Sequence, residues 1–99
     1  MCFEIDFSPD AISQLKALRK RDQVVVLDAI ERQLRDTPFA TTRNRKPMRS
    51  NILATWELRV GVFRVYYDIN VVKESVAITA IGMKIQNRLF IAGEEITLP

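Results

Sequence analysis

The 99-residue sequence contains no histidine and a single cysteine, Cys2. Without histidine, neither a Ser-His-Asp nor a Cys-His catalytic arrangement can form, and one cysteine alone cannot build a nitrogen and sulfur cage for zinc. One cysteine also excludes an internal disulfide, so nothing in the sequence requires an oxidising compartment. Any acid-base chemistry must therefore use Lys, Arg, Tyr, Asp or Glu side chains, and no metal or organic cofactor is implied.

Long apolar runs are also absent. No stretch approaches the roughly 20 residues that a membrane-spanning helix needs, and the opening MCFEIDFSPD carries acids instead of the basic residues of a secretion signal. We therefore expect a cytoplasmic protein with no membrane partner. A chain of 99 residues with 47% hydrophobic composition suffices for one hydrophobic core, so residues 1–99 are expected to form a single domain.

The net charge of +3 is concentrated in the middle of the chain. Residues 41–64 contain six basic residues and one acid, whereas residues 1–40 contain six bases and seven acids, and residues 65–99 contain three bases and four acids. Such a local excess attracts an anionic partner, most commonly the phosphates of a nucleic acid. A solvated basic loop is the alternative explanation for this segment.

Hydrophobic periodicity predicts a strand followed by two helices in the first part of the chain. Alternation over residues 2–7 is typical of a half-buried strand. Ser8-Pro9-Asp10 then supplies an N-cap, a proline at the first helical position and an acid in the first turn. Asp22 is expected to cap a second helix that ends before Pro38, so the two helices form a hairpin.

Alternation after the basic stretch predicts three strands, over residues 56–60, 63–69 and 75–82. Consecutive strands with short connections form an antiparallel meander. The pattern leaves open where the first strand lies in the sheet. Glu94 and Glu95 are expected to belong to a solvated tail.

Strand phase divides the side chains of the meander between two faces. One face must be buried under the two helices, which gives an α+β fold with a small antiparallel sheet and an N-terminal helical hairpin packed on one face. The residues expected on this buried face are Trp56, Phe63, Val65 and Tyr67. Arg59, Arg64 and Tyr66 have the opposite phase, and we expect their face to be open. This face is a candidate surface for an anion or a nucleic acid, although exposed arginines can also serve only solubility.

Two segments carry a resemblance to a known family: LRVGVFRVYYDI at residues 58–69 and AITAIGMKIQNRLF at residues 77–90. In this order, after a strand, a helical hairpin and a basic connection, they resemble the RelE/ParE superfamily of type II toxin-antitoxin toxins over nearly the whole chain. The resemblance implies a cognate antitoxin protein as partner, with operator DNA contacted only through the antitoxin. Members similar to RelE cut messenger RNA inside the ribosome, and members similar to ParE poison DNA gyrase.

The resemblance to RelE-like nucleases also implies roles for single residues. Arg64 matches the hairpin arginine that contacts the scissile phosphate, and Lys84 matches a second cation that stabilises charge or acts as an acid. Thr55 and Glu57 stand where such nucleases often have lysines, and Phe90 stands where many have a tyrosine.

RNA cleavage by attack of a 2′-hydroxyl on the neighbouring phosphate needs a proton acceptor, stabilisation of phosphoryl charge and a proton donor. Glu57 and Tyr66 share a predicted face with Arg64 and are candidates for the acceptor. The residues expected to hold ribosomal or messenger RNA are Arg43, Arg45, Lys46, Arg49 and Arg59. We therefore expect a toxin that inhibits translation by ribosome-dependent mRNA cleavage. The alternatives are a ParE-like gyrase inhibitor and a catalytically inactive relative that only binds its antitoxin or nucleic acid.

Overall fold

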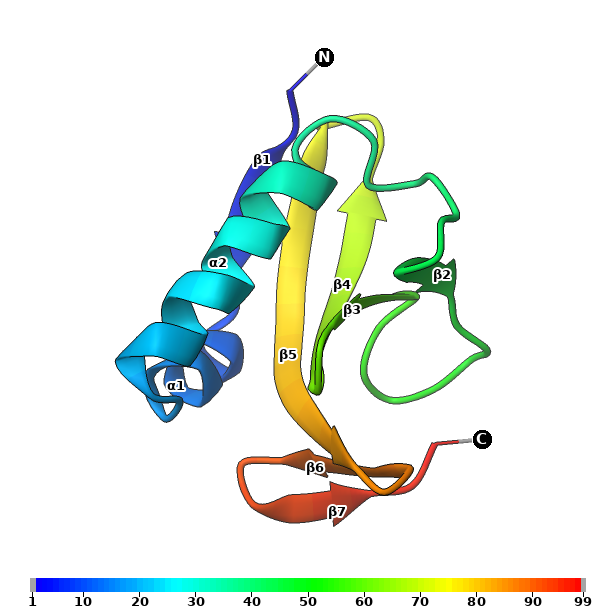
Figure 1. Ribbon diagram of the computed structural model, residues 1–99. Coiled ribbons are helices and arrows are strands. Elements are labelled where there is room, and N and C mark those ends of the chain that lie inside the picture. Colours follow the sequence, from blue (N-terminus) through cyan, green and yellow to red (C-terminus); the bar gives the residue numbers. More distant parts are fainter. Residues whose placement is uncertain (1, 99) are drawn as a thin grey trace.

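The computed structural model describes residues 2–98, which form two helices and seven strands (Figure 1). In chain order the elements are β1 (Glu4–Phe7), α1 (Pro9–Lys16), α2 (Lys20–Leu34), β2 (Arg45–Pro47), β3 (Trp56–Val60), β4 (Phe63–Asn70), β5 (Ser75–Ile85), β6 (Arg88–Ile91) and β7 (Glu94–Ile96). The helical hairpin packs on one face of the sheet, which confirms the predicted α+β fold. Within the part of the chain that the structure describes, no helix is long and apolar enough to cross a membrane.

The two helices begin differently. Ser8 caps α1, because its Oγ accepts a hydrogen bond from the backbone N–H of Ala11 at 3.1 Å, and Pro9 occupies the first helical position as predicted. Helix α2 begins at Lys20 with Arg19 as its N-cap and without a side-chain capping bond. The prediction that Asp22 caps α2 is therefore wrong, because the short connection between the helices lets α2 begin earlier and places Asp22 in its first turn.

The central part of the sheet is the predicted antiparallel meander of β3, β4 and β5. Strand β2 extends it beside β3, and β6 and β7 extend it beyond β5. Strand β1, whose place the sequence left open, pairs in parallel with the first part of β5, from Glu4 opposite Ser75 to Phe7 opposite Ile78. The second part of β5 pairs with β6, from Met83 opposite Phe90. Strands β1 and β6 therefore share one edge of β5, while β4 occupies the other edge.

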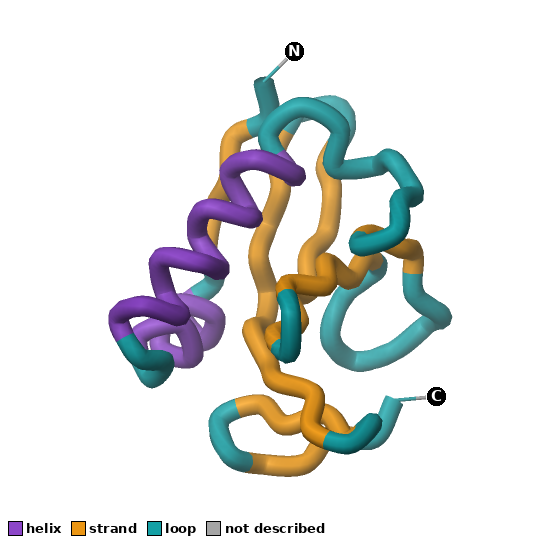
Figure 2. Tube along the Cα trace, in the orientation of Figure 1, coloured by secondary structure: helices purple, strands orange, loops and turns teal. Residues whose placement is uncertain are grey.

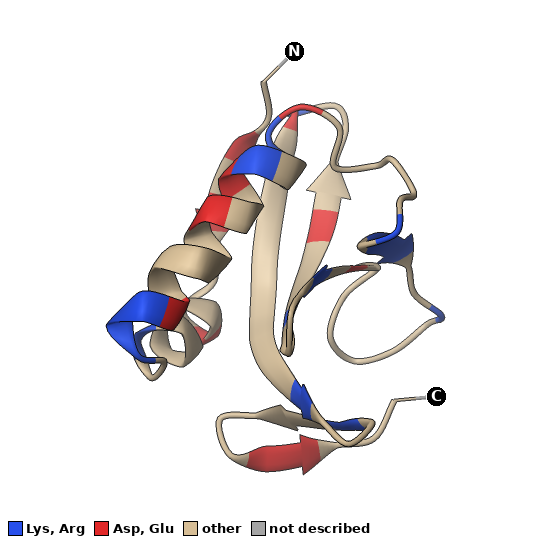
Figure 3. Cartoon of the chain, viewed as in Figure 1, with Lys and Arg blue, Asp and Glu red and all other residues tan. Residues whose placement is uncertain are grey.

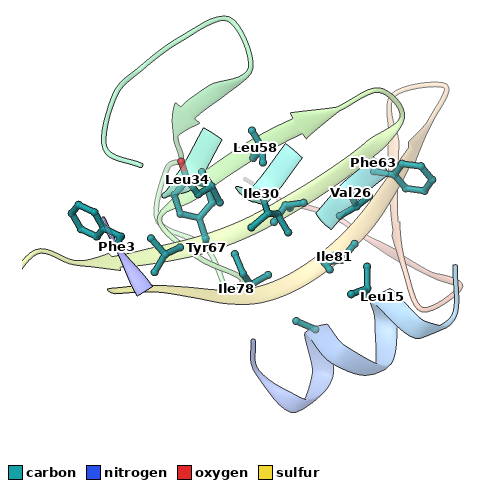
Figure 4. Packing of buried hydrophobic residues seen from close by; sticks show 13 residues of the cluster. Phe3, Leu15, Val26, Ile30, Leu34, Leu58, Phe63, Tyr67, Ile78 and Ile81 are labelled. Atoms are coloured by element: carbon teal, nitrogen blue, oxygen red, sulfur yellow. The ribbon is translucent and has the colours of Figure 1, made fainter. Parts of the chain in front are cut away.

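The main core lies between the helices and the sheet (Figure 4). Its large buried side chains include Phe3, Leu15, Val26, Ile30, Leu34, Leu58, Phe63, Val65, Tyr67 and Ile78. Trp56 packs against this core, and its ring stacks on Tyr67 with 6.0 Å between ring centroids. The predicted assignment of Trp56, Phe63, Val65 and Tyr67 to the helix-covered face is thus confirmed.

The opposite face of the sheet is covered as well. A second and separate cluster buries Tyr66, Ala80, Leu89 and Ile91, and several partly buried apolar side chains pack against it. These side chains are Met48, Leu53, Ala54, Ile96 and Leu98. The prediction of an open face is therefore wrong at Tyr66, which is fully buried.

The cover of this face comes from the loop at residues 48–54 and from the C-terminal segment. Strand β5 runs on to Ile85, and β6 and β7 then form a hairpin that crosses the end of the sheet (Figure 2). Glu94 and Glu95 are exposed as predicted, but the prediction that they form a tail is wrong, because both residues belong to β7. Alternation within a strand indicates which side chains share a face, but it does not indicate which later segment covers that face.

Candidate functional site

A groove of about 500 Å³ lies between β2, β3 and the C-terminal hairpin. Its charged lining residues are Lys46, Arg49, Glu57, Lys84, Arg88 and Glu95. Figure 3 shows the cations of β2, of the end of β5 and of the start of β6 around this region, with the acids of β7 beside them, whereas further acids lie away from it on β1 and α2. A concave site with four cations against two acids is suited to a polyanion.

Glu57 is the buried acid of this groove. It is 5% exposed in the middle of β3, opposite Lys46 in β2 and opposite Tyr66 in β4. The Lys46 Nζ lies 3.9 Å from Glu57 Oε1, and the lysine side chain itself is largely exposed. A carboxylate held at the base of a cationic groove is well placed to accept a proton from a bound substrate.

Tyr66 lies beside Glu57 but below the apolar cover. Its hydroxyl is buried and finds no hydrogen-bond partner within residues 2–98. Burial, and then the nearby Glu57 carboxylate, raise the pKa of Tyr66 well above its ordinary value of about 10. Tyr66 is therefore protonated at neutral pH and can donate a hydrogen bond, so Glu57 is the better of the two predicted proton acceptors.

Arg64 occupies the same face, opposite Arg59 in β3 and Gly82 in β5. It is 8% exposed, and its Nη1 donates hydrogen bonds to the carbonyl oxygens of Gly61 at 2.8 Å and Phe63 at 2.9 Å. Its Nε is buried and has no hydrogen-bond partner among the described residues. Burial, and then the charge of Arg59, lower the pKa of Arg64. Because its charged form is disfavoured there, an anion bound beside Arg64 would stabilise that charge.

Gly82 explains how the C-terminal hairpin comes so close to Arg64. A Cβ at this position would lie 2.8 Å from Ile91 Cγ1 and 3.1 Å from Leu89 Cδ1. Only glycine leaves room for these two side chains of β6 to pass over β5 beside Arg64. The arginine predicted to face solvent is thus partly enclosed by the end of the chain.

Arg45 does not join the groove. It lies opposite Leu58 on the helix-covered side of the sheet, and its Nη1 donates to the carbonyl oxygens of Gln33 and Thr37, both at 2.6 Å. These bonds fasten the end of α2 to β2. The predicted RNA contact by Arg45 therefore conflicts with its position, because strand phase turns it inward while its neighbour Lys46 turns toward the groove.

Of the other residues predicted to bind RNA or to act in cleavage, some line the groove and some lie outside it. Arg49 and Lys84 line the groove, whereas Arg43 and Arg59 are exposed outside it. Thr55 is occupied by a hydrogen bond from its Oγ1 to Asp68 Oδ1 at 2.8 Å.

Sequence reasoning missed two residues of the groove, Arg88 and Glu95. The Arg88 Nη2 lies 2.7 Å from Glu95 Oε1, across the β6–β7 hairpin, and the Arg88 guanidinium carbon lies 5.6 Å from the centre of the Phe90 ring. The two-residue turn Ala92-Gly93, directly after the apolar run Leu89-Phe90-Ile91, was the available signal for a hairpin here.

The fold defined by these elements is that of RelE-like proteins from toxin-antitoxin complexes. One chain of the toxin-antitoxin complex RelBE2 from Mycobacterium tuberculosis matches with a TM-score of 0.69 and 23% identity, covering 85% of this chain and 100% of that chain. A chain of the archaeal RelE-RelB complex from Pyrococcus horikoshii OT3 matches with a TM-score of 0.65 and 16% identity, covering 87% and 99%. No protein-family model and no curated protein matches the sequence. The structural matches confirm the fold that the sequence resemblance predicted.

Proposed function

We propose that this chain is the toxin of a type II toxin-antitoxin system and that it inhibits translation by cleaving messenger RNA on the ribosome. The observation that carries the proposal is the groove in which the buried carboxylate of Glu57 lies among cations. The fold shared with chains of two toxin-antitoxin complexes supports the assignment as a toxin with a cognate antitoxin.

In the proposed reaction, Glu57 accepts the proton of a ribose 2′-hydroxyl, whose oxygen then forms a bond to the adjacent phosphorus. The bond from phosphorus to the 5′-oxygen breaks, and Lys84 donates a proton to that leaving oxygen. Lys46 in the groove stabilises the negative charge on the phosphoryl oxygens, and the buried Arg64, which does not line the groove, contributes through its charge. The products are a 2′,3′-cyclic phosphate and a 5′-hydroxyl, so atoms and charges balance without a metal or cofactor.

The cations outside this centre would hold the RNA backbone. Arg49 and Arg88 line the groove, and Arg43 and Arg59 are exposed. The ribosome and its messenger RNA are the proposed partners, and an antitoxin would neutralise the chain by covering the groove. Operator DNA would be reached only through the antitoxin.

The test is a cell-free translation reaction with the purified chain, followed by mapping of cuts in the messenger RNA. We expect cuts only when ribosomes are present. General acid-base catalysis contributes about 10²–10⁴-fold, so Glu57→Gln should lower the rate of cutting by roughly that factor. Glu4→Gln, which changes an exposed acid at the far end of β1, is the matched control and should cut as the unaltered chain does.

Intact messenger RNA in the presence of a folded chain would overturn the nuclease proposal. Loss of DNA supercoiling by gyrase in the presence of the chain would then support the ParE-like alternative. Binding of RNA or an antitoxin, without an effect on either process, would support the inactive relative.

A further inference from the structure

The two hydrophobic clusters differ in whether their buried polar groups have hydrogen-bond partners. In the main core, the Tyr67 hydroxyl donates to the carbonyl oxygen of Pro38 at 2.8 Å. In the second cluster, the Tyr66 hydroxyl lies near the Glu57 carboxylate but has no partner within hydrogen-bond distance, and Arg64 Nε has none either, within the described residues. A buried donor without a partner opposes folding, so two such donors on one face need a reason.

The cover over these donors has few attachments to the rest of the sheet. Strand β6 pairs with β5 through three residue pairs at positions 83–85 and 88–90, and β7 is paired with β6. The turn before β6 contains Gln86 and Asn87, and both have positive φ angles, at 52° and 66°. Few pairs and two residues in a left-handed conformation make this junction a favourable place for local opening.

The hairpin is held together within itself. Arg88 donates to Glu95 through two nitrogens, at 3.0 Å and 2.7 Å, across the two strands. The hairpin can therefore leave the sheet as one unit, without the loss of this ion pair.

The other part of the cover is the loop at residues 48–54. Asn51 Oδ1 accepts hydrogen bonds from the backbone N–H groups of Leu53 and Ala54 within this loop, at 2.7 Å and 3.1 Å. The Thr79 hydroxyl on β5 donates to the carbonyl oxygen of Leu53 at 2.9 Å, which ties the loop to the centre of the sheet. The hairpin, by contrast, follows β5 through the single turn at residues 86–87, so it is the part that can swing away as one unit.

We propose that the β6–β7 hairpin is a cover that opens when RNA enters the groove, and that the uncovered Tyr66 hydroxyl donates a hydrogen bond to a phosphate oxygen beside Arg64. The nature of the ligand rests on the proposed function, whereas the opening of the hairpin does not. Because the second cluster is separate from the main core, the hairpin opens without unfolding the helices or β4. The raised pKa of Tyr66 keeps its proton available for donation.

The chain offers an internal control for the opening, because its two tyrosines are adjacent and both fully buried. Nitration by tetranitromethane would be compared between Tyr67→Phe, which leaves Tyr66, and Tyr66→Phe, which leaves Tyr67. We expect Tyr66 to react at least tenfold faster, while hydrogen exchange shows that the amides of β4 stay protected at the same global stability. Equal nitration rates for the two tyrosines, after correction for the global unfolding of each variant, would overturn the proposal that the hairpin opens.

The donor role is tested with a single-stranded RNA oligonucleotide whose 2′-O-methyl riboses prevent cleavage. We expect this RNA to slow the nitration of Tyr66 and to speed hydrogen exchange at residues 88–96. Tyr66→Phe should bind the same RNA several-fold more weakly without losing stability. A merely structural hydroxyl would give the reverse result, with stability lost and RNA binding unchanged, and that result would overturn the proposal.

These measurements remain informative if the chain never cuts messenger RNA. Faster nitration of Tyr66 and its protection by RNA would support the cover and the donor in a chain that only binds RNA. Fast nitration of Tyr66 that RNA does not slow would overturn the proposal that its hydroxyl donates to RNA, whatever the outcome of the cleavage assay.

Discussion

Tyr66 and Tyr67 are neighbours in β4 and are equally buried, but they lie on opposite faces of the sheet. The hydroxyl of Tyr67 bonds to the Pro38 carbonyl under the helices, whereas the hydroxyl of Tyr66 has no such bond among residues 2–98. Arg45 and Arg64 differ less. Each donates to two carbonyl groups through Nη1, but Arg64 also has a buried Nε without a partner among the described residues. Two side chains that are equally buried can therefore differ in whether all of their polar atoms find hydrogen-bond partners.

Truncation of a leucine on each face should give the largest difference. Leu58 is fully buried in the main core and Leu89 lies in the second cluster. Leu58→Ala should cost about 3–5 kcal/mol of unfolding free energy, and Leu89→Ala about 2 kcal/mol or less, because a movable hairpin can close over the gap. Urea denaturation followed by circular dichroism measures both, and equal losses would show that the two faces are equally rigid.

Two adjacent cations of β2 should separate stability from binding. Arg45→Met should cost about 2 kcal/mol, because two partly buried carbonyl groups lose a charged donor, and it should leave RNA affinity unchanged. Lys46→Met should change stability by less than about 0.5 kcal/mol. It should weaken RNA binding and lower the slope of log affinity against log salt by about 0.7. An RNA defect in Arg45→Met at unchanged stability would contradict the assignment of Arg45 to structure.

High pH should destabilise the chain through both tyrosines. Burial raises the pKa of each above the ordinary value of about 10, so the unfolded state loses these protons first and the native state binds more protons. The unfolding free energy should thus be unaffected by them below pH 10 and then fall by about 1.4 kcal/mol per pH unit for each tyrosine. Tyr66→Phe should roughly halve this slope in urea titrations between pH 10 and 11, and an unchanged slope would mean that Tyr66 ionises without unfolding.

Removal of one tyrosine hydroxyl at neutral pH should give the smallest changes in unfolding free energy, and the two tyrosines should differ in the sign of the change. Tyr67→Phe breaks the bond to Pro38 and should cost about 1 kcal/mol, with the Pro38 carbonyl left unpaired. Tyr66→Phe removes an unpartnered hydroxyl and should leave stability unchanged or slightly raised. Thermal unfolding of the two variants side by side measures the difference, and a loss of stability in Tyr66→Phe would indicate a hydrogen bond in solution.

The sequence predicted those features that depend on neighbouring residues. The start of α1 at Ser8 and Pro9 and the phase of side chains in β3 and β4 are local patterns, and both were confirmed. The candidate site was predicted less completely. Glu57 and Lys84 both line one groove, but Arg88 was missed because the β6–β7 hairpin that carries it was not predicted.

The features that failed depend on contacts between distant segments. The covered face depends on how β5 bends after Gly82, and the inward position of Arg45 depends on where α2 ends. Neither is encoded in the residues that flank the site. Strand alternation therefore placed side chains on the correct face. It could not show whether that face is exposed to solvent, lines a groove or is buried under another segment.

The parallel pairing of β1 with β5 bears on the order in which the chain folds. Ser8 and Thr79, joined by a hydrogen bond of 3.1 Å, are separated by 71 positions, and Glu4 pairs with Ser75. Contacts between such distant positions close slowly and late in folding. During synthesis, β1 and α1 must wait until β5 has been made before they can dock. The first strand to leave the ribosome therefore cannot join the sheet until the fifth has followed it.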